Sequence, residues 1–598
     1  MGKSCAPGRR STITTARAVS AGPFASAPLI PAPERGAYRN PFVSVPTAEL
    51  TARAAGAPSG AQPASLLKRL TGARLYLALA GLALLIGALS LLVPSTPSYD
   101  PWAWLVWGRE IVHLKLHTTG GPSWKPLPLV FTTLFAPFGK AAPDLWLMVA
   151  RAGAVMALAM VFKVSVRLTQ QLGDTMRSAA AGTRATASGA RAALGGLPGT
   201  VLAPALLAGL VAAAGLLNSR GFISDNALGY SEGLMTALVL VAVDRHLDGQ
   251  RRQAFAVGFF AALDRPEIWL FWGPYGLWLW WTDPGARKLV AALFVLIPVF
   301  WFLPEYLGSH HFFRGVSRAQ HPRSNSPAFA KCPFCSELGT HAWRTVLLRV
   351  KVIAAVAVVL SAGLLWGQRR ARAGWTLASP RERAQAGLVL TGVLGLAWWI
   401  VIALMTQAGF SGNDRYLVLG AALVLIAGGT GWGWAALELG RLLPRYVGPV
   451  RALGARAPAT GIAVLLAAVL LVLPNWIGGN VIDLQRSHRA LVYQAHLRDS
   501  AAAAVAKLGG AGRIIACGTV MTEGFQVPLL AWTLGAHILQ VQAAPVGPGT
   551  PPPAPNVIFQ TRAQHHAHLL PLLSTWPGTH YKLVLPTKTF RVYEHCAG

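Results

Sequence analysis

The chain has 598 residues, of which 53% are hydrophobic and 13% charged, and its apolar residues stand in long blocks. This pattern excludes a soluble globular protein and is typical of a polytopic integral membrane protein. The formal net charge of +31 would suit a nucleic-acid-binding protein, but the basic residues lie between the apolar blocks, so we interpret them as topology signals and anionic-lipid contacts and expect no nucleic acid as a partner.

Residues 1–70 are expected to form a disordered, basic tail in the cytoplasm. The segment is rich in Ala, Pro, Ser and Arg and has no apolar run that could bury a core. The first hydrophobic block begins near Leu75, which is too late for a signal peptide. The excess of Lys and Arg before this block favours a cytoplasmic N-terminus, because positively charged flanks tend to stay inside.

Residues 71–480 are predicted to form an all-α, multi-pass domain of about eleven transmembrane helices in the cell membrane. Single spans are expected near 75–94, 144–166, 197–217, 229–246, 288–304, 345–366, 385–406, 416–437 and 458–474. The block 253–281 is long for one helix and has Asp264, Arg265, Pro266 and Glu267 in its middle, where charge is unfavourable and Pro lacks a backbone donor. We interpret it as two short helices in a hairpin, which puts the downstream loop 305–343 outside. The loop 95–143 follows the first span after a cytoplasmic N-terminus and is expected outside as well.

Residues 484–598 are less hydrophobic and are expected to form a small α/β domain on the outer face. Strands are predicted at 513–520, 537–542, 556–560 and 581–596, and helices around Ala501–Leu508 and Pro528–Leu534. Pro545–Pro555 is predicted to be a surface loop, and no catalytic motif stands out in this domain.

The cysteines favour the same topology. Cys332 and Cys335 share one outer loop, and Cys517 and Cys596 share the C-terminal domain, so both pairs would face the oxidising compartment, while Cys5 would stay inside. The alternatives are unrelated thiols, a redox-exchange pair, or a metal site at the first pair. Such a metal site would need further ligands, for which the nearby candidates are His310, His311, His321 and His341.

The first outer loop carries the most informative motifs. Tyr99-Asp100 follows a span, Trp107–Ile111 reads WGREI, and Lys125–Pro128 reads KPLP. This order resembles the bacterial GT-C membrane glycosyltransferases, particularly those of the aminoarabinose-transferase and protein O-mannosyltransferase type. Shorter matching segments follow at Gly229–Leu238, Leu263–Glu267 and Asn413–Val418. Where that family often has Glu before the Lys-Pro pair, this chain has Trp124, so the sugar preference cannot be copied.

The resemblance implies a hexosyl- or pentosyltransferase that moves a sugar from a polyprenyl-phosphate donor to a glycan, lipid or protein acceptor outside the membrane, with inversion at the anomeric carbon. It also implies that Asp100 deprotonates the acceptor hydroxyl. A carboxylate at the membrane boundary can meet both a lipid donor and a polar acceptor, which favours the same role. The alternative is a helix cap or loop acid before Pro101.

A departing polyprenyl phosphate needs fixed cations, and Lys125, Arg265 and Arg415 are the candidates. The alternative for Lys125 is a surface lysine beside prolines. For Arg265 it is an ion pair with Asp264 or Glu267 that stabilises the hairpin turn. For Arg415 it is a contact with lipid headgroups just before a span.

The remaining substrate-binding candidates are Arg109, Glu110, Glu232, Glu267 and Tyr416. Glu232 resembles the second acidic position of the family, which binds acceptor or a divalent ion, and the alternative is an acid that complements a helix dipole. Arg109 and Glu110 are interpreted mainly as members of an amphipathic interfacial helix with Trp boundary residues.

No phosphate-binding loop, HExxH motif or GxSxG triad is present, so we expect no nucleotide cofactor, whereas a divalent cation stays open. Two rivals remain. The first is a transporter or flippase of lipid-linked sugars, against which the lack of a convincing internal repeat counts modestly. The second is a non-catalytic membrane scaffold.

Overall fold

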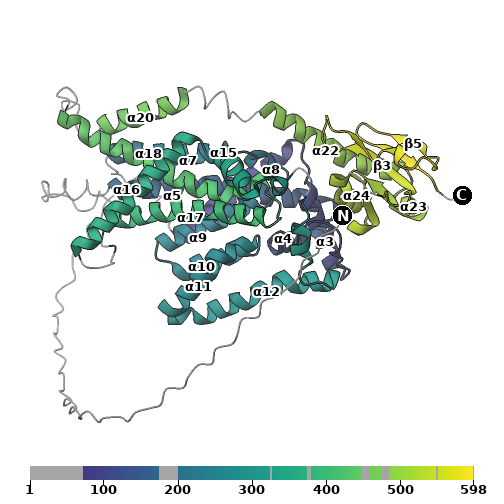
Figure 1. Cartoon of the computed structure of the whole chain (residues 1–598), viewed down its shortest axis with the longest axis horizontal. Coiled ribbons are helices and arrows are strands. Elements are labelled where there is room, and N and C mark those ends of the chain that lie inside the picture. Colours follow the sequence, from purple (N-terminus) through teal and green to yellow (C-terminus); the bar gives the residue numbers. More distant parts are fainter. Residues whose placement is uncertain are drawn as a thin grey trace, which may run out of the picture. The chain divides into compact units, whose positions relative to one another are not determined.

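The computed structural model describes residues 72–173, 199–322, 326–372, 377, 379–446, 457–472, 484–546 and 550–596. The tail expected at 1–70 lies outside these residues. Figure 1 shows a bundle of long helices, followed along the chain by a small region that contains the strands.

Each predicted single span corresponds to a helix. These helices are α2 (Ala73–Leu89), α5 (Ala142–Gly173), α7 (Gly199–Leu217), α9 (Glu232–Leu247), α12 (Arg287–Ser309), α16 (Leu348–Arg372), α17 (Pro380–Gln407), α18 (Val418–Tyr446) and α20 (Ala457–Val472). Among the described residues, six segments are long and apolar enough to cross a membrane, and they contain α2, α5, α12, α16, α17 and α18. The polytopic helical class is therefore confirmed. For α7, α9, α20 and the two hairpin helices, membrane crossing stays a prediction.

The block 253–281 is a helical hairpin, as predicted. Its arms are α10 (Arg251–Ala262) and α11 (Trp269–Thr282). The rings of Phe255 and Trp272 stack across the arms with centroids 4.5 Å apart, and the Trp272 indole donates to the Phe255 carbonyl. The chain leaves the helical conformation at Arg265, whose φ of −144° and ψ of 131° are the extended values that a following proline favours.

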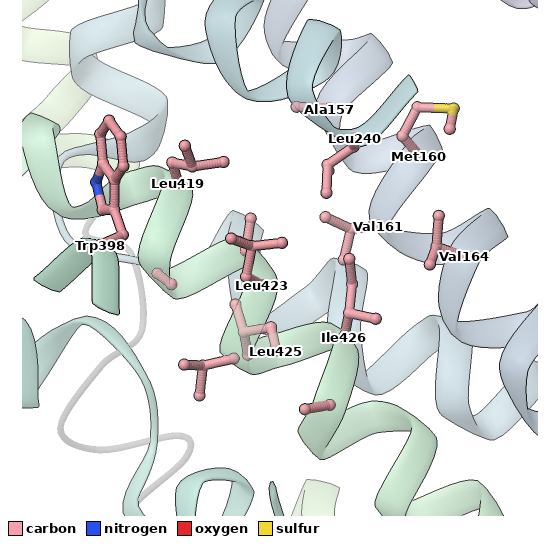
Figure 2. Close-up of a cluster of buried hydrophobic side chains, with 14 of the residues drawn as sticks. Ala157, Met160, Val161, Val164, Leu240, Trp398, Leu419, Leu423, Leu425 and Ile426 are labelled. Carbon is pink, nitrogen blue, oxygen red and sulfur yellow. The ribbon is translucent and has the colours of Figure 1, made fainter. Parts of the chain in front are cut away.

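The bundle core lies between α5, α9, α17 and α18. Figure 2 shows side chains from these helices directed toward one another, among them Val161, Leu240, Trp398 and Leu423. Close approach of α18 to α7 requires a small residue, because a Cβ at Gly429 would lie 2.4 Å from the Ala208 carbonyl oxygen. Small residues at such crossings let helix backbones pack within van der Waals contact.

A polar cluster joins α2, α5 and α9 inside this bundle. The fully buried Asp244 accepts hydrogen bonds from Tyr76, Lys163 and Arg167. Because every charge in it has a partner, we interpret this cluster as a structural anchor.

Shorter helices connect the spans. They are α3 (Tyr99–Val112), α4 (Pro126–Phe135), α8 (Phe222–Ala227), α13 (Arg314–Ala319), α14 (Pro333–Ser336) and α15 (Trp343–Thr345). Short 3-10 segments are η1 (Ser90–Leu92), η2 (Ala136–Ala141), η3 (Pro266–Ile268), η4 (Pro284–Ala286), η5 (Pro327–Phe329), η7 (Asp414–Leu417), η8 (Gly524–Gln526), η9 (Ile538–Gln540) and η10 (Leu573–Thr575), and η6 (Glu337–Ala342) is a π-helix.

The prediction of an interfacial α3 is wrong. Trp102, Trp104 and Trp107 are all buried inside the protein instead of lying at a lipid boundary. Trp104 packs edge-on against Trp146 of α5, and Trp107 packs against Trp124. The Trp-rich helix is therefore a core element, because neighbouring segments cover nearly all of its faces.

The C-terminal α/β region is confirmed. Its helices are α22 (Leu484–Lys507), α23 (Ala511–Cys517) and α24 (Val527–Thr533), and its strands are β1 (Val520–Thr522), β2 (Val541–Ala543), β3 (Val557–Arg562), β4 (Leu569–Leu570), β5 (Lys582–Pro586) and β6 (Arg591–Glu594). The sheet order is β2-β1-β3-β6-β5, with β4 paired to β3. β1 pairs in parallel with β2 and β3, whereas β6 pairs antiparallel with β3 and β5.

Three strand predictions in this region need correction. Most of 513–520 is helix α23 and only its end is strand, 537–540 is mainly the 3-10 segment η9, and 581–596 is a hairpin of two strands. A short apolar run does not by itself distinguish a strand from a helix, since in α23 Ile514 is buried while Ile515 is exposed. The strand at 556–560 and the helix at Pro528–Leu534 are confirmed within a residue or two.

Both predicted cysteine pairs are disulfides, Cys332–Cys335 and Cys517–Cys596. A metal site with thiolates of Cys332 and Cys335 is therefore wrong, since both sulfurs are used in the bond. Cys5 lies outside the described residues.

Candidate active site

Asp100 lies in the first turn of α3 and forms an ion pair with Arg415 of η7. Arg415 Nη2 donates to Asp100 Oδ2 at 2.8 Å, and the two side chains are 14% and 15% exposed. The residue before the helix is Ser98, so the helix-cap alternative for Asp100 is wrong. The lipid-headgroup alternative for Arg415 is wrong as well, because its guanidinium is directed into the protein.

Glu232, the first residue of α9, joins all three predicted cations. Its Oε1 lies 3.2 Å from Lys125 Nζ, 3.3 Å from Arg265 Nη1 and 3.4 Å from Arg415 Nε, and its side chain is 2% exposed. Lys125 comes from the residue before α4, and Arg265 from the hairpin turn. Four distant parts of the sequence thus meet at one carboxylate oxygen.

The hairpin turn supplies a second acid. Arg265 donates to both carboxylate oxygens of Glu267, at 2.6 and 3.2 Å. The expected ion pair with Glu267 is therefore present, but it exists beside the contact with Glu232. We call the following residues the charge cluster: Asp100, Lys125, Glu232, Arg265, Glu267 and Arg415.

Aromatic rings hold the cations in place. The Arg415 guanidinium lies 4.0 Å from the centroid of the Tyr230 ring, and that of Arg265 lies 3.6 Å from Tyr416. Lys125 Nζ lies 5.4 Å from the Trp104 ring. Cation–π contacts of this kind orient a charge without neutralising it. Tyr416 therefore lies beside the predicted cations, and its role in binding substrate stays a prediction.

The cations of the charge cluster are matched by its carboxylates. Burial alone would lower the pKa of Lys125, but Glu232 and Asp264 raise it above its ordinary value, so the ammonium stays protonated. Any anion that binds these cations must therefore compete with carboxylates.

A cavity opens beside the charge cluster. It encloses about 1010 Å³ of atom-free space, part of which is open to solvent. Lys125, Arg265 and Tyr416 contribute polar groups to its wall. Most of the other lining residues are apolar or aromatic: Trp124, Pro266, Trp269, Trp301, Phe302, Phe312, Phe313, Val316, Ala319, Ile402, Met405 and Phe410. Apolar walls with a few convergent polar groups are typical of a ligand site.

Arg109 and Glu110 do not reach this cluster. Arg109 donates to the backbone carbonyls of Trp532 and Ala536, and Glu110 pairs with His537 Nδ1 at 2.8 Å. Ten residues of helix separate Glu110 from Asp100, a rise of about 15 Å. Burial raises the pKa of Glu110, against the opposing effect of the His117 backbone N–H and of His537. Both residues hold the C-terminal domain to α3, and a substrate-binding role for them stays a prediction.

Several site residues were missed or undervalued at the level of sequence. The sequence predicts Asp264 only as a charge of the hairpin turn and a possible partner of Arg265, and Tyr230 and Ser231 only as members of the Gly229–Leu238 segment. Ser231 accepts a hydrogen bond from Lys125 at 3.3 Å, and Tyr230 lies under Arg415. The sequence signal for these two residues was their position directly before the predicted acid Glu232. Nothing in the sequence pointed to Trp104 or to Glu305, which lines the cavity from α12.

The described residues contain no group of three or more His, Cys, Asp and Glu side chains arranged to hold a metal ion. The question of a divalent cation therefore stays open.

A buried acid lies beside η7. Glu337 is 0% exposed. Nearby, His341 Nδ1 forms a hydrogen bond with Asp414 Oδ1 at 2.6 Å. Arg220 forms an ion pair with Asp414 Oδ2 at 3.0 Å. Burial raises the pKa of Glu337 to about 7. This carboxyl was not among the predicted site residues.

Replacing Glu337 with Gln should give a pH-dependent gain in stability. Between about pH 4.5 and 7 the unfolded chain binds fewer protons at this position than the folded protein, so the stability of the unsubstituted protein falls as pH rises through that window. A Gln side chain does not titrate, so E337Q does not lose stability in this way as the pH rises. The difference in melting temperature between E337Q and the unsubstituted protein should therefore be larger at pH 8 than at pH 5, and a difference independent of pH would contradict a buried neutral acid.

Comparison with known proteins assigns no family: no family model matches the sequence, and no curated protein matches it. The structure is similar to the crystal structure of ArnT from Cupriavidus metallidurans bound to undecaprenyl phosphate, with a TM-score of 0.45 and 12% identity over 88% of this chain and 98% of that chain. For ArnT in the apo state the TM-score is 0.41, with 13% identity over 87% and 97%. Scores below 0.5 do not establish a shared family.

Proposed function

We propose that the chain is an integral membrane glycosyltransferase that moves a sugar from a polyprenyl-phosphate donor to an acceptor outside the cytoplasmic membrane. The acceptor would be a cell-envelope glycan, a lipid or a protein. The proposal is supported chiefly by the meeting of Asp100 and three largely buried cations beside an aromatic-lined cavity, whose wall includes Lys125 and Arg265. In this proposal the N-terminus lies in the cytoplasm and the C-terminal domain outside, which the two disulfides favour.

The proposed chemistry needs one base and one anion site. Asp100 takes the proton of the acceptor hydroxyl, whose oxygen attacks the anomeric carbon of the donor from the face opposite the phosphate. The bond from the anomeric carbon to the phosphate oxygen breaks, and its electron pair leaves with the polyprenyl phosphate. Lys125, Arg265 and Arg415 stabilise the departing charge in a site from which water is largely excluded.

Arg415 gives this mechanism an order. It is paired with Asp100 before any donor is bound. A donor phosphate that attracts Arg415 would draw it away from Asp100 and leave the carboxylate free to accept the proton of the acceptor hydroxyl. Transfer would then start mainly when the donor is present.

The test is transfer by the purified full-length chain in liposomes. Radiolabelled polyprenyl-phosphate sugars and envelope acceptors are supplied from the outer side, and labelled acceptor is the expected product. Vectorial movement of the lipid without labelled acceptor would instead support a transporter or flippase. If neither labelled acceptor nor movement of the lipid is observed, the non-catalytic scaffold is the alternative that remains.

Replacing Lys125 with Ala should weaken the use of donor more than the use of acceptor. The ammonium is a charge-assisted donor for the phosphate, and its loss should raise the KM for donor about 10- to 100-fold. Lys140→Ala, at an exposed lysine of η2, is the matched control and should leave both KM values unchanged. An unaltered donor KM in K125A would remove Lys125 from the phosphate site.

A further inference from the structure

Asp264 is a buried acid that the proposed mechanism does not use. It lies in the turn of the α10–α11 hairpin, lines the cavity and is 0% exposed. Neither of its carboxylate oxygens has a hydrogen bond of standard geometry among the described residues. The Ser231 hydroxyl is close enough to lower the pKa of this carboxyl. Burial raises the pKa of Asp264, with Lys125 opposing this effect. A buried carboxyl without a donor is rare in native proteins and calls for an explanation.

Two tryptophans beside Asp264 are fixed by a shared contact. The indole N–H groups of Trp269 and Trp301 donate to the same carbonyl, that of Ala262, at 3.0 and 3.1 Å. Their rings pack edge to face with centroids 5.5 Å apart. Both residues line the cavity. Because the backbone takes up their polar N–H groups, these rings offer only apolar surface to a ligand.

A sugar ring presents the two kinds of surface that these groups complement. Its hydroxyls can donate to a carboxylate oxygen or accept from a protonated carboxyl. Its C–H faces are apolar and pack against aromatic rings. A bare lipid phosphate has neither hydroxyls nor a ring. Lys125 lines the same cavity and acts electrostatically on Asp264, so a phosphate held there would bring its attached sugar toward this carboxyl.

We propose that Asp264, Trp269 and Trp301 form the subsite for the sugar ring of the donor, and that Asp264 forms a hydrogen bond with one of its hydroxyls. The inference rests on the proposed function and deepens it. Asp264 would be a specificity-determining residue, separate from the cations that hold the phosphate. The alternative is that Asp264 is only a counter-charge for Lys125 and Arg265.

The test measures binding to the full-length protein in nanodiscs. The probes are undecaprenyl phosphate and undecaprenyl phosphates that carry mannose or arabinose. In Asp264→Asn, affinity for bare undecaprenyl phosphate should stay within about twofold, and affinity for the preferred sugar-bearing lipid should fall at least about tenfold, the scale of one lost charged hydrogen bond. Asp283→Asn, at a carboxylate that is 29% exposed and lies at the other end of α11, is the matched control and should leave both affinities unchanged.

Stability without lipid separates the two readings of Asp264. If it serves a ligand, D264N should melt at the same temperature as the unsubstituted protein or higher, because an unpartnered buried acid is removed. A lower melting temperature together with equal losses for both kinds of lipid would show a structural counter-charge and overturn the subsite. Trp301→Leu is the second variant, and it should weaken only the sugar-bearing lipids.

The failure of this inference is distinguishable from that of the proposed function. If the unsubstituted protein binds undecaprenyl phosphate but no sugar-bearing form more tightly, the sugar subsite is overturned while the phosphate site stands. If it binds none of these lipids, the proposed donor class itself is wrong, and the subsite falls with it.

Discussion

Replacing Asp100 with Asn is expected to abolish sugar transfer, with a fall in kcat of about 10²- to 10⁴-fold, the usual contribution of a general base. Asn keeps the size of the side chain and can still accept a hydrogen bond from Arg415 through its amide oxygen. The cluster should therefore stay assembled while the base is lost. The measurement is single-turnover transfer at saturating donor, with expression and melting temperature followed in parallel.

Asp248→Asn is the matched control for this variant. Asp248 is also a partly exposed carboxylate in ion pairs with arginines, Arg167 and Arg245, but it follows α9 at the opposite end from Glu232. It should retain the turnover of the unsubstituted protein. Near-normal turnover in D100N would remove Asp100 as the base, and equal losses in both variants would indicate a general effect of lost charge.

The membrane fold could be predicted from the sequence because lipid imposes long apolar runs. The hairpin at 253–281 was predictable for the same reason, since Asp264 to Glu267 could not lie mid-span without a turn. The contacts of Arg109 and Glu110 in the folded protein could not be predicted. Their partners, Trp532, Ala536 and His537, lie more than 400 residues along the chain in a region with no motif.

The charge cluster was predictable as residues but not as a geometry. Asp100, Lys125, Glu232 and the two arginines each stood at a turn or helix end, and the order of their motifs resembled a known family. That three cations converge on Oε1 of Glu232 depends on how four helices pack, which local patterns do not specify. Asp264 was not predicted as a site residue for a related reason, because the sequence does not show whether a carboxyl has a hydrogen-bond partner.

The convergence on Glu232 leads to the largest stability effect that we expect. Glu232→Gln would leave Lys125, Arg265 and Arg415 with one carboxylate fewer in a site where these side chains are 12%, 7% and 15% exposed. Breaking a buried ion pair by removing one partner is destabilising by about 3–5 kcal/mol, because the remaining charges stay buried without compensation. A clear fall in melting temperature in nanodiscs is therefore expected.

The size of this loss of stability depends on how exposed the carboxylate is, and Glu438 provides the comparison. Its carboxylate also pairs with two arginines, Arg381 and Arg441, but its side chain is 37% exposed, and ion pairs of that kind contribute about 0–1 kcal/mol. E438Q should therefore melt close to the unsubstituted protein. In E232Q, adding Lys125→Gln should restore part of the lost stability, since one uncompensated cation is removed. An E232Q protein as stable as E438Q would mean that solvent or lipid phosphate already screens the cluster.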